Sequence, residues 1–378
     1  MSYLEMSAEV QALLRVSYSL LTLLMLGLSF PNSHRFFSTE KYRGYAESGR
    51  IKDILLSPWG RVILLSVWVS ASCWLLMGRY TVVAALICLG LSRYFFVSAR
   101  WTSIARGMGA PGFMLYWLGA LVFLLEYSSK FEPTGYLRAL VLLAFKIDFA
   151  VIFLCAGQYK LFSGYPQNNG MERGMVNPWW GYWWKQYRRL PPGHPVFRTL
   201  NHLAYLTEIA TAVLMMIPRF SELGALTLAA TFVFIGCNIR LGFLCETVIA
   251  CCFLFGAPGG VIDTVAKWFF TSPPSSAGIT ALAPLNLFIA GFLCFYILML
   301  PVTKAGLYYN FYARKRLPQK WQAWQDYWAN LMGIIIWRVF TIDNTNFYVQ
   351  AWFENKKTGE RRLYSKIGKL DPEADFRY

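Results

Sequence analysis

Three charged residues interrupt a stretch that otherwise has the composition of a membrane-spanning helix, FKIDFAVIFLCAGQYKL from Phe145 to Leu161. They are Lys146, Asp148 and Lys160. A charge in the hydrocarbon core costs about 3 kcal/mol on insertion scales, so such residues usually meet a partner or a polar cavity. Lys146 and Asp148 point about 200° apart around a helix and cannot neutralise each other. We therefore expect each to interact with another helix, as a charge relay or as a lock between helices.

Two carboxylates in other apolar segments are expected near the membrane side where Lys160 lies. Glu208 lies about two and a half turns into the sixth apolar segment, deep enough to pair with Lys146 or Lys160. Glu246 lies near the start of the eighth segment. The functional hypothesis is a ligand pocket whose charged wall consists of Lys160, Glu208 and Glu246.

Three further residues are candidate ligand-binding groups of the same polar layer. Arg93 lies near the end of the third apolar segment, Arg240 begins the eighth, and His202 opens the sixth. The alternative explanation is that Arg93, Lys160 and Arg240 extend to lipid headgroups, and that the carboxylates only neutralise them.

The composition indicates that these residues lie in a polytopic membrane protein. Of 378 residues, 56% are hydrophobic and only 15% are charged. We predict an all-α fold with about nine transmembrane helices, interfacial helices and a small C-terminal β-hairpin. The nine apolar segments are 11–30, 61–77, 81–97, 111–127, 137–160, 199–217, 223–239, 241–256 and 281–302.

The distribution of lysine and arginine predicts the orientation. Loops after odd-numbered segments carry most of the cations, especially 35–52 and 173–198, whereas loops after even-numbered segments carry Arg79, Lys130, Arg219 and Lys267. Cytoplasmic loops are the basic ones, so the N-terminus is expected outside and the C-terminus in the cytoplasm, in a bacterial inner membrane. The net charge of +16 is explained by this topology, and no nucleic-acid partner is expected.

Three regions follow from these patterns. Residues 1–303 form the predicted transmembrane domain, 304–340 the interfacial amphipathic helices, and 341–378 a small cytoplasmic hairpin and loose tail. NPWWGYWWKQYRRLPPGHP, residues 177–195, mixes aromatic and basic residues as an interfacial belt does. Trp321, Trp324, Trp328, Leu331 and Ile335 recur on one helical face.

No metal site is predicted. The eight cysteines lie in or beside apolar segments without a C-x-x-C pair, and the chain has only three histidines. The cysteines are expected to act as small hydrophobic residues.

At AGQYKLFSGY, NPWWGYWWKQY and HLAYLTEIATAVL the chain resembles the vitamin K-dependent gamma-carboxylase-like family, also called the horizontally transferred transmembrane domain (HTTM) family. Trp337 to Phe340, ahead of the hairpin, adds to the resemblance. The resemblance implies a nine-span fold in which Lys160 is the base that deprotonates a quinol. The ligand it implies is a quinone or a bound lipid that arrives through the bilayer.

The chain also departs from that family. The carboxylases carry a large soluble domain after the spans, whereas only a short tail follows here, and the predicted orientation places Lys160 on the cytoplasmic side. Protein carboxylation is therefore not expected.

Three function classes remain open. The first is an enzyme in which Lys160, Glu208 and Glu246 act on a quinone or lipid-like substrate. The second is an accessory subunit that docks to other membrane proteins through its aromatic belt and tail. The third is a transporter that uses Lys146 and Asp148. Membrane lipids are expected partners in each case.

Overall fold

The computed structural model describes residues 3–98, 104–132, 134–162, 165, 170–178, 180–271, 283–332, 351–356 and 358–364. The motif from Trp337 to Phe340, the last interfacial residue Ile335 and the tail after residue 371 lie outside these ranges.

The described chain is almost entirely helical. Its helices are α1 (Ala8–Ser29), α2 (Ser33–Phe36), α3 (Arg50–Leu55), α4 (Pro58–Leu76), α5 (Thr81–Arg93), α6 (Ile104–Phe131), α7 (Tyr136–Phe162), α8 (Gly170–Val176), α9 (Trp184–Tyr187), α10 (Pro195–Met216), α11 (Ser221–Asn238), α12 (Leu244–Cys252), α13 (Val261–Phe269), α14 (Ala283–Tyr312) and α15 (Gln319–Met332). A π-helical turn, Tyr94–Ser98, extends α5. Short 3₁₀ turns are Phe30–Asn32, Glu40–Tyr42, Pro218–Phe220 and Phe253–Phe255.

Several helices are long and apolar enough to cross a membrane. Within the described chain there are six such segments: Ala8–Phe36, Pro58–Leu76, Gly112–Phe131, Tyr136–Phe162, Pro218–Asn238 and Ala283–Asn310. Two apolar segments, Thr81–Phe96 and Leu244–Phe255, are shorter. The prediction of a helical membrane protein is therefore confirmed, whereas the count of nine spans stays a prediction.

Local sequence explains where several helices begin. The Ser7 hydroxyl accepts a hydrogen bond from the backbone N–H of Val10 and caps α1. α4 and α10 both begin with proline, which needs no backbone donor in the first turn.

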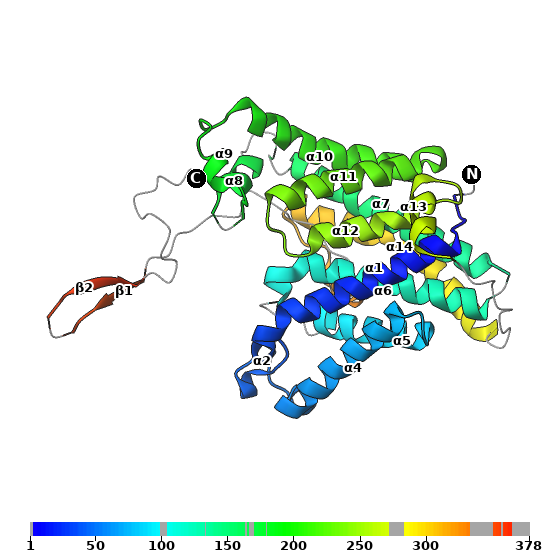
Figure 1. Cartoon of the computed structure of the whole chain (residues 1–378), viewed down its shortest axis with the longest axis horizontal. Coiled ribbons are helices and arrows are strands. Elements are labelled where there is room, and N and C mark those ends of the chain that lie inside the picture. The colour runs from blue at the N-terminus through cyan, green and yellow to red at the C-terminus, as the bar shows by residue number, and fades with distance from the viewer. Residues whose placement is uncertain are drawn as a thin grey trace.

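The long helices run side by side as a bundle (Figure 1). α7 packs against α6, α10 and α14, while α1 packs against α4, α6 and α12. α2, α8 and α9 lie at one end of the bundle, and the N-terminus and α13 lie at the other.

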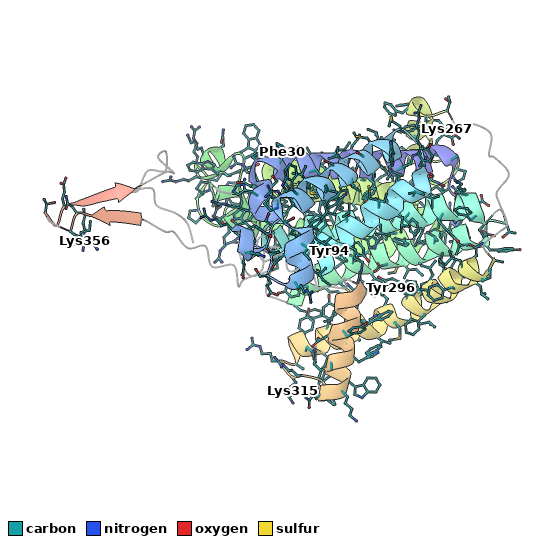
Figure 2. All side chains as sticks on the ribbon, turned by 90° about the horizontal axis from the view of Figure 1, so that it is seen from below. Phe30, Tyr94, Lys267, Tyr296, Lys315 and Lys356 are labelled. Carbon is teal, nitrogen blue, oxygen red and sulfur yellow. The ribbon has the colours of Figure 1, made fainter. Side chains whose placement is uncertain are left out.

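α14 and α15 form a helical elbow. Figure 2 shows α15 crossing the direction of the long helices, with Lys315 at the bend. A Cβ added to Gly306 would collide with the Gln325 side chain, so α15 approaches α14 closely there.

Two short antiparallel strands, β1 (Ala351–Glu354) and β2 (Arg361–Tyr364), follow in sequence, with Ala351 opposite Tyr364. The C-terminal hairpin as a folded unit stays a prediction, because the residues that flank these strands lie outside the described ranges.

Candidate functional site

A glycine on α7 allows α10 to come close. A Cβ added to Gly157 would lie 2.6 Å from Ile209 Cγ1 and 3.0 Å from the Tyr205 carbonyl oxygen. Small residues at such crossings let transmembrane helices approach at backbone distance. Lys160 is one turn further along α7, so this contact determines what its side chain can reach on α10.

Lys160 forms a buried ion pair with Glu208. Its Nζ lies 2.5 Å from Glu208 Oε1. Only 6% of Lys160 and 3% of Glu208 are exposed. The other carboxylate oxygen, Glu208 Oε2, is buried and has no hydrogen-bond partner among the described residues. The pair thus leaves one strong acceptor position open.

Tyr165 closes one side of this pair. Lys160 Nζ lies 5.9 Å from the centre of the Tyr165 ring, within the range of a cation–π interaction. The Tyr165 hydroxyl is buried and lacks a hydrogen-bond partner in the described chain. Burial, followed by the negative charge of Glu208, raises the pKa of Tyr165 above its ordinary value of 10. The phenol therefore stays protonated and can donate a hydrogen bond.

Asn201 holds Tyr165 in this position. The Asn201 side chain donates from Nδ2 to the Tyr165 carbonyl oxygen and accepts at Oδ1 from the backbone N–H of Met171 at 3.2 Å. α10 therefore contributes Glu208 and also binds the backbone of Tyr165 and Met171. Neither Tyr165 nor Asn201 was predicted as a site residue, although the tyrosine belongs to the AGQYKLFSGY motif.

These side chains bring together a cation, a carboxylate with an unpartnered oxygen and a phenol that can donate a hydrogen bond. A ligand oxygen that accepts from Tyr165 and donates to Glu208 would satisfy both unpartnered groups. We name Lys160, Glu208 and Tyr165 the Lys160 centre.

The structure does not bring the predicted wall residue Glu246 into contact with this centre. Glu246 is exposed on α12, and it forms no hydrogen bond or ion pair with the described residues. The expectation failed because position along the membrane normal does not determine the direction in which a helix presents its side chains.

The other candidate ligand-binding groups also have separate contacts. Arg93 donates to the Tyr116 hydroxyl at 3.0 Å. Arg240 is exposed and lies 4.9 Å over the Tyr182 ring. His202 is exposed, with Nδ1 2.9 Å from the Tyr205 hydroxyl. A common polar layer with Lys160 is therefore not formed by these three side chains.

Lys146 contacts neutral groups directly. Its Nζ donates to the Tyr3 carbonyl oxygen at 2.7 Å and lies 4.6 Å over the Tyr3 ring. The Phe255 ring is on another side, at 5.5 Å. Glu222 interacts with this lysine only electrostatically. The direct partner of this lysine is therefore a backbone oxygen of the chain preceding α1, not a side chain of a neighbouring helix.

Asp148 is likewise held by neutral donors. Its Oδ2 accepts from Trp117 Nε1 at 2.8 Å and from the Tyr296 hydroxyl at 2.9 Å. Lys304, buried on α14, interacts electrostatically with this carboxylate. Asp148 therefore connects α6, α7 and α14, and the contacts described for Lys146 and Asp148 do not join them.

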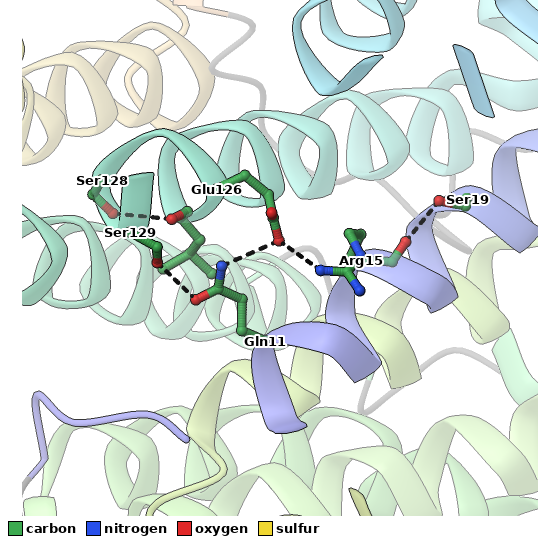
Figure 3. Close-up of polar contacts among 7 residues, drawn as sticks. Gln11, Arg15, Ser19, Glu126, Ser128 and Ser129 are labelled. Atoms are coloured by element: carbon green, nitrogen blue, oxygen red, sulfur yellow. Dashed lines mark hydrogen bonds and ion pairs between the residues drawn. The ribbon is translucent and has the colours of Figure 1, made fainter. Parts of the chain in front are cut away.

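A second ion pair, between the buried Glu126 and the partly buried Arg15, was not predicted. Glu126 Oε1 on α6 accepts from Arg15 Nη1 at 3.2 Å and from Gln11 Nε2 at 3.1 Å, and Ser129 donates to Gln11 at 3.0 Å (Figure 3). Gln11 and Arg15 are four residues apart on α1 and so share a face. That spacing was the available signal.

Among the described residues, no group of three histidine, cysteine, aspartate or glutamate side chains could hold a metal ion.

No protein family matches the chain, and no curated protein or solved structure matches it.

Proposed function

We propose that the Lys160 centre is an acid–base site that binds a quinone or lipid-like ligand. The observation that carries the proposal is the pair of buried, unpartnered oxygens, Glu208 Oε2 and the Tyr165 hydroxyl, beside Lys160. Unpaired polar groups in such a place are costly, and each is stabilised when a ligand supplies its hydrogen bond.

In the proposed reaction the ligand oxygen accepts a hydrogen bond from Tyr165 and donates one to Glu208 Oε2. In the neutral-amine form of the pair, Glu208 holds the shared proton at Oε1, beside Lys160 Nζ. When Oε2 takes the proton of the hydroxyl of a quinol or lipid-like ligand, Oε1 passes its proton to Lys160, which is thus the base, as the resemblance to gamma-carboxylase-like proteins suggests. The resulting ligand oxyanion is stabilised by the Tyr165 donor and the new Lys160 cation, while Glu208 relays the proton and positions the amine.

The proposal includes nine spans, α1, α4, α5, α6, α7, α10, α11, α12 and α14, and a small C-terminal hairpin in the cytoplasm. Support comes from the position of α2, α8 and α9, whose basic segments lie at one end of the bundle, opposite α13. The basic end is cytoplasmic under the positive-inside rule, with the N-terminus outside. The proposed location is a bacterial inner membrane.

The test is to purify the protein from native membranes in mild detergent and identify bound small molecules by mass spectrometry. We compare the wild type with Lys160→Met and with the matched control Lys146→Met, which removes another buried lysine from the same helix. The expected result is a quinone or lipid-like molecule that the wild type and the control retain and Lys160→Met loses. Equal ligand content in all three correctly folded proteins would contradict the proposal.

A second candidate function is that of an accessory subunit of a larger membrane complex. It is favoured by the exposed aromatic side chains before α9: Trp180, Tyr182 and Trp183 are 46%, 50% and 52% exposed. The same purification tests it. A partner protein present with wild type and Lys160→Met, and lost with Tyr182→Ser/Trp183→Ser, would support this function over catalysis.

A further inference from the structure

The bend between α14 and α15 carries a dense group of cations. Within the sequence Arg314 to Lys320, the side chains of Arg314, Lys315, Arg316 and Lys320 are all exposed. None of these four forms an ion pair or side-chain hydrogen bond with the described residues. We call these four residues the elbow cations.

Aromatic side chains continue the surface along α15. Trp321, Trp324 and Tyr327 are 65%, 37% and 67% exposed. Lys320, Trp324 and Tyr327 follow the spacing i, i+4 and i+7, which places them on one side of the helix. Tryptophan and tyrosine with adjacent lysine or arginine are the combination found at headgroup level.

An adjoining side of α15 is fixed to α14. Gln325 and Trp328 are 2% and 8% exposed. The Trp328 ring packs edge-on against Phe295 of α14, with centroids 5.2 Å apart. Asn310 Nδ2 of α14 donates to Gln322 Oε1 at 2.9 Å. These contacts hold α15 across the direction of the long helices, so its free side presents cations and aromatic rings together (Figure 2).

The amphipathic helix α13 provides an internal comparison. It exposes Trp268 and Phe269 at 75% and 71%, so it has a similar aromatic surface. Its cation, however, is neutralised: Lys267 Nζ lies 2.7 Å from Asp263 Oδ2. The elbow cations lack such an acidic partner in the described chain, so their charge is available to an anion outside the chain.

We propose that the elbow cations and the exposed aromatic side of α15 form a docking surface for anionic phospholipid headgroups of the surrounding membrane. Clustered basic residues beside a transmembrane helix attract anionic lipid by about 1 kcal/mol each. The aromatic rings enter the headgroup region and bring the cations to the phosphates. This surface is separate from the Lys160 centre.

The test measures lipid retention by the full-length protein in detergent with equal amounts of phosphatidylglycerol and phosphatidylcholine, using native mass spectrometry. The wild type is expected to retain phosphatidylglycerol preferentially. Arg314→Gln/Lys315→Gln/Arg316→Gln/Lys320→Gln is expected to lower that preference at least about tenfold, since four attractive charges are lost. The matched control, Lys41→Gln/Arg43→Gln/Arg50→Gln/Lys52→Gln, removes the same charge elsewhere and should keep the preference.

An equal loss in the control would overturn the proposal, because net charge alone would then explain the binding. Arg314→Lys/Arg316→Lys should behave as wild type, since a lipid surface responds to charge rather than to a guanidinium fork. A loss in this variant would indicate a geometric anion site and overturn the lipid surface. If the variant with four substitutions does not fold, the salt dependence of the wild type tests the proposal. Its preference for phosphatidylglycerol should decrease when salt is raised from 50 to 500 mM, about a threefold decrease in screening length. A constant preference would overturn the proposal.

Discussion

Lys160 and Glu208 are buried charges that contact each other directly, whereas Lys146 and Asp148 contact neutral groups. This difference determines what substitutions should do. Removing one member of a buried pair leaves the other charge uncompensated, while removing both with apolar residues of similar size avoids that penalty.

We therefore expect Lys160→Met alone, and Glu208→Leu alone, to lower the free energy of unfolding by about 3 kcal/mol. The double variant should recover most of the loss. Unfolding in mixed micelles, followed by circular dichroism, measures this coupling. Additive losses in the double variant would show that the two side chains do not stabilise each other.

Tyr165 separates a structural role of the centre from a ligand-binding role. Its hydroxyl is buried without a partner in the described chain, so Tyr165→Phe should leave stability unchanged or raise it by up to about 1 kcal/mol. Ligand retention should nevertheless fall, because the ligand loses its donor.

The control for that prediction is Tyr187→Phe. The Tyr187 hydroxyl lies 2.6 Å from Asn238 Oδ1, so its loss should cost about 1 kcal/mol of stability and leave ligand retention intact. A Tyr165→Phe protein that binds ligand as wild type does would remove Tyr165 from the proposed site.

At the scale of elements, the crossing of α7 and α10 controls the Lys160 centre through Gly157. A methyl group there would press on Ile209 and on the α10 backbone. We expect Gly157→Ala to destabilise the protein by about 1–3 kcal/mol and to weaken ligand retention, because α10 moves away with Glu208. Thermal unfolding and ligand content of the purified protein test both effects.

The matched control is Gly90→Ala on α5, where a Cβ would meet no atom within 4 Å. This substitution should be neutral or slightly stabilising, since alanine favours the helical backbone. If Gly157→Ala were as harmless as Gly90→Ala, close approach of the two helices would not be required for the site.

At the scale of the molecule, the proposed nine spans place consecutive turns on opposite membrane sides. Single cysteines at positions 43 and 189 should therefore react with a membrane-impermeant thiol reagent only after the cytoplasmic side is opened. Cysteines at positions 79 and 219 should react in intact cells. A background of Cys237→Ser/Cys294→Ser removes the exposed native thiols.

Labelling of position 43 in intact cells would reverse the orientation and put the Lys160 centre on the outer side. Labelling of positions 79 and 219 from opposite sides would instead mean that an odd number of spans separates them, and the proposed arrangement of nine spans would be wrong.

The sequence by itself determined the helical membrane class, because the length and polarity of apolar runs are local properties that the bilayer constrains directly. It also identified Lys160 as a charge at a helix end and Glu208 as a possible partner. Charge cost in hydrocarbon makes such residues visible without any knowledge of packing.

The tertiary structure decided which groups meet. Glu208 pairs with Lys160 while Glu246 faces outward, Lys146 reaches a backbone oxygen of Tyr3, and Glu126 pairs with Arg15. Helix rotation and close approach determine these contacts, and both depend on residues such as Gly157 whose role appears only when two helices are in contact. A backbone carbonyl and an unpartnered phenol carry no sequence signal of their own. Lys160 and Glu208 of the Lys160 centre were therefore predictable, whereas Tyr165 was not.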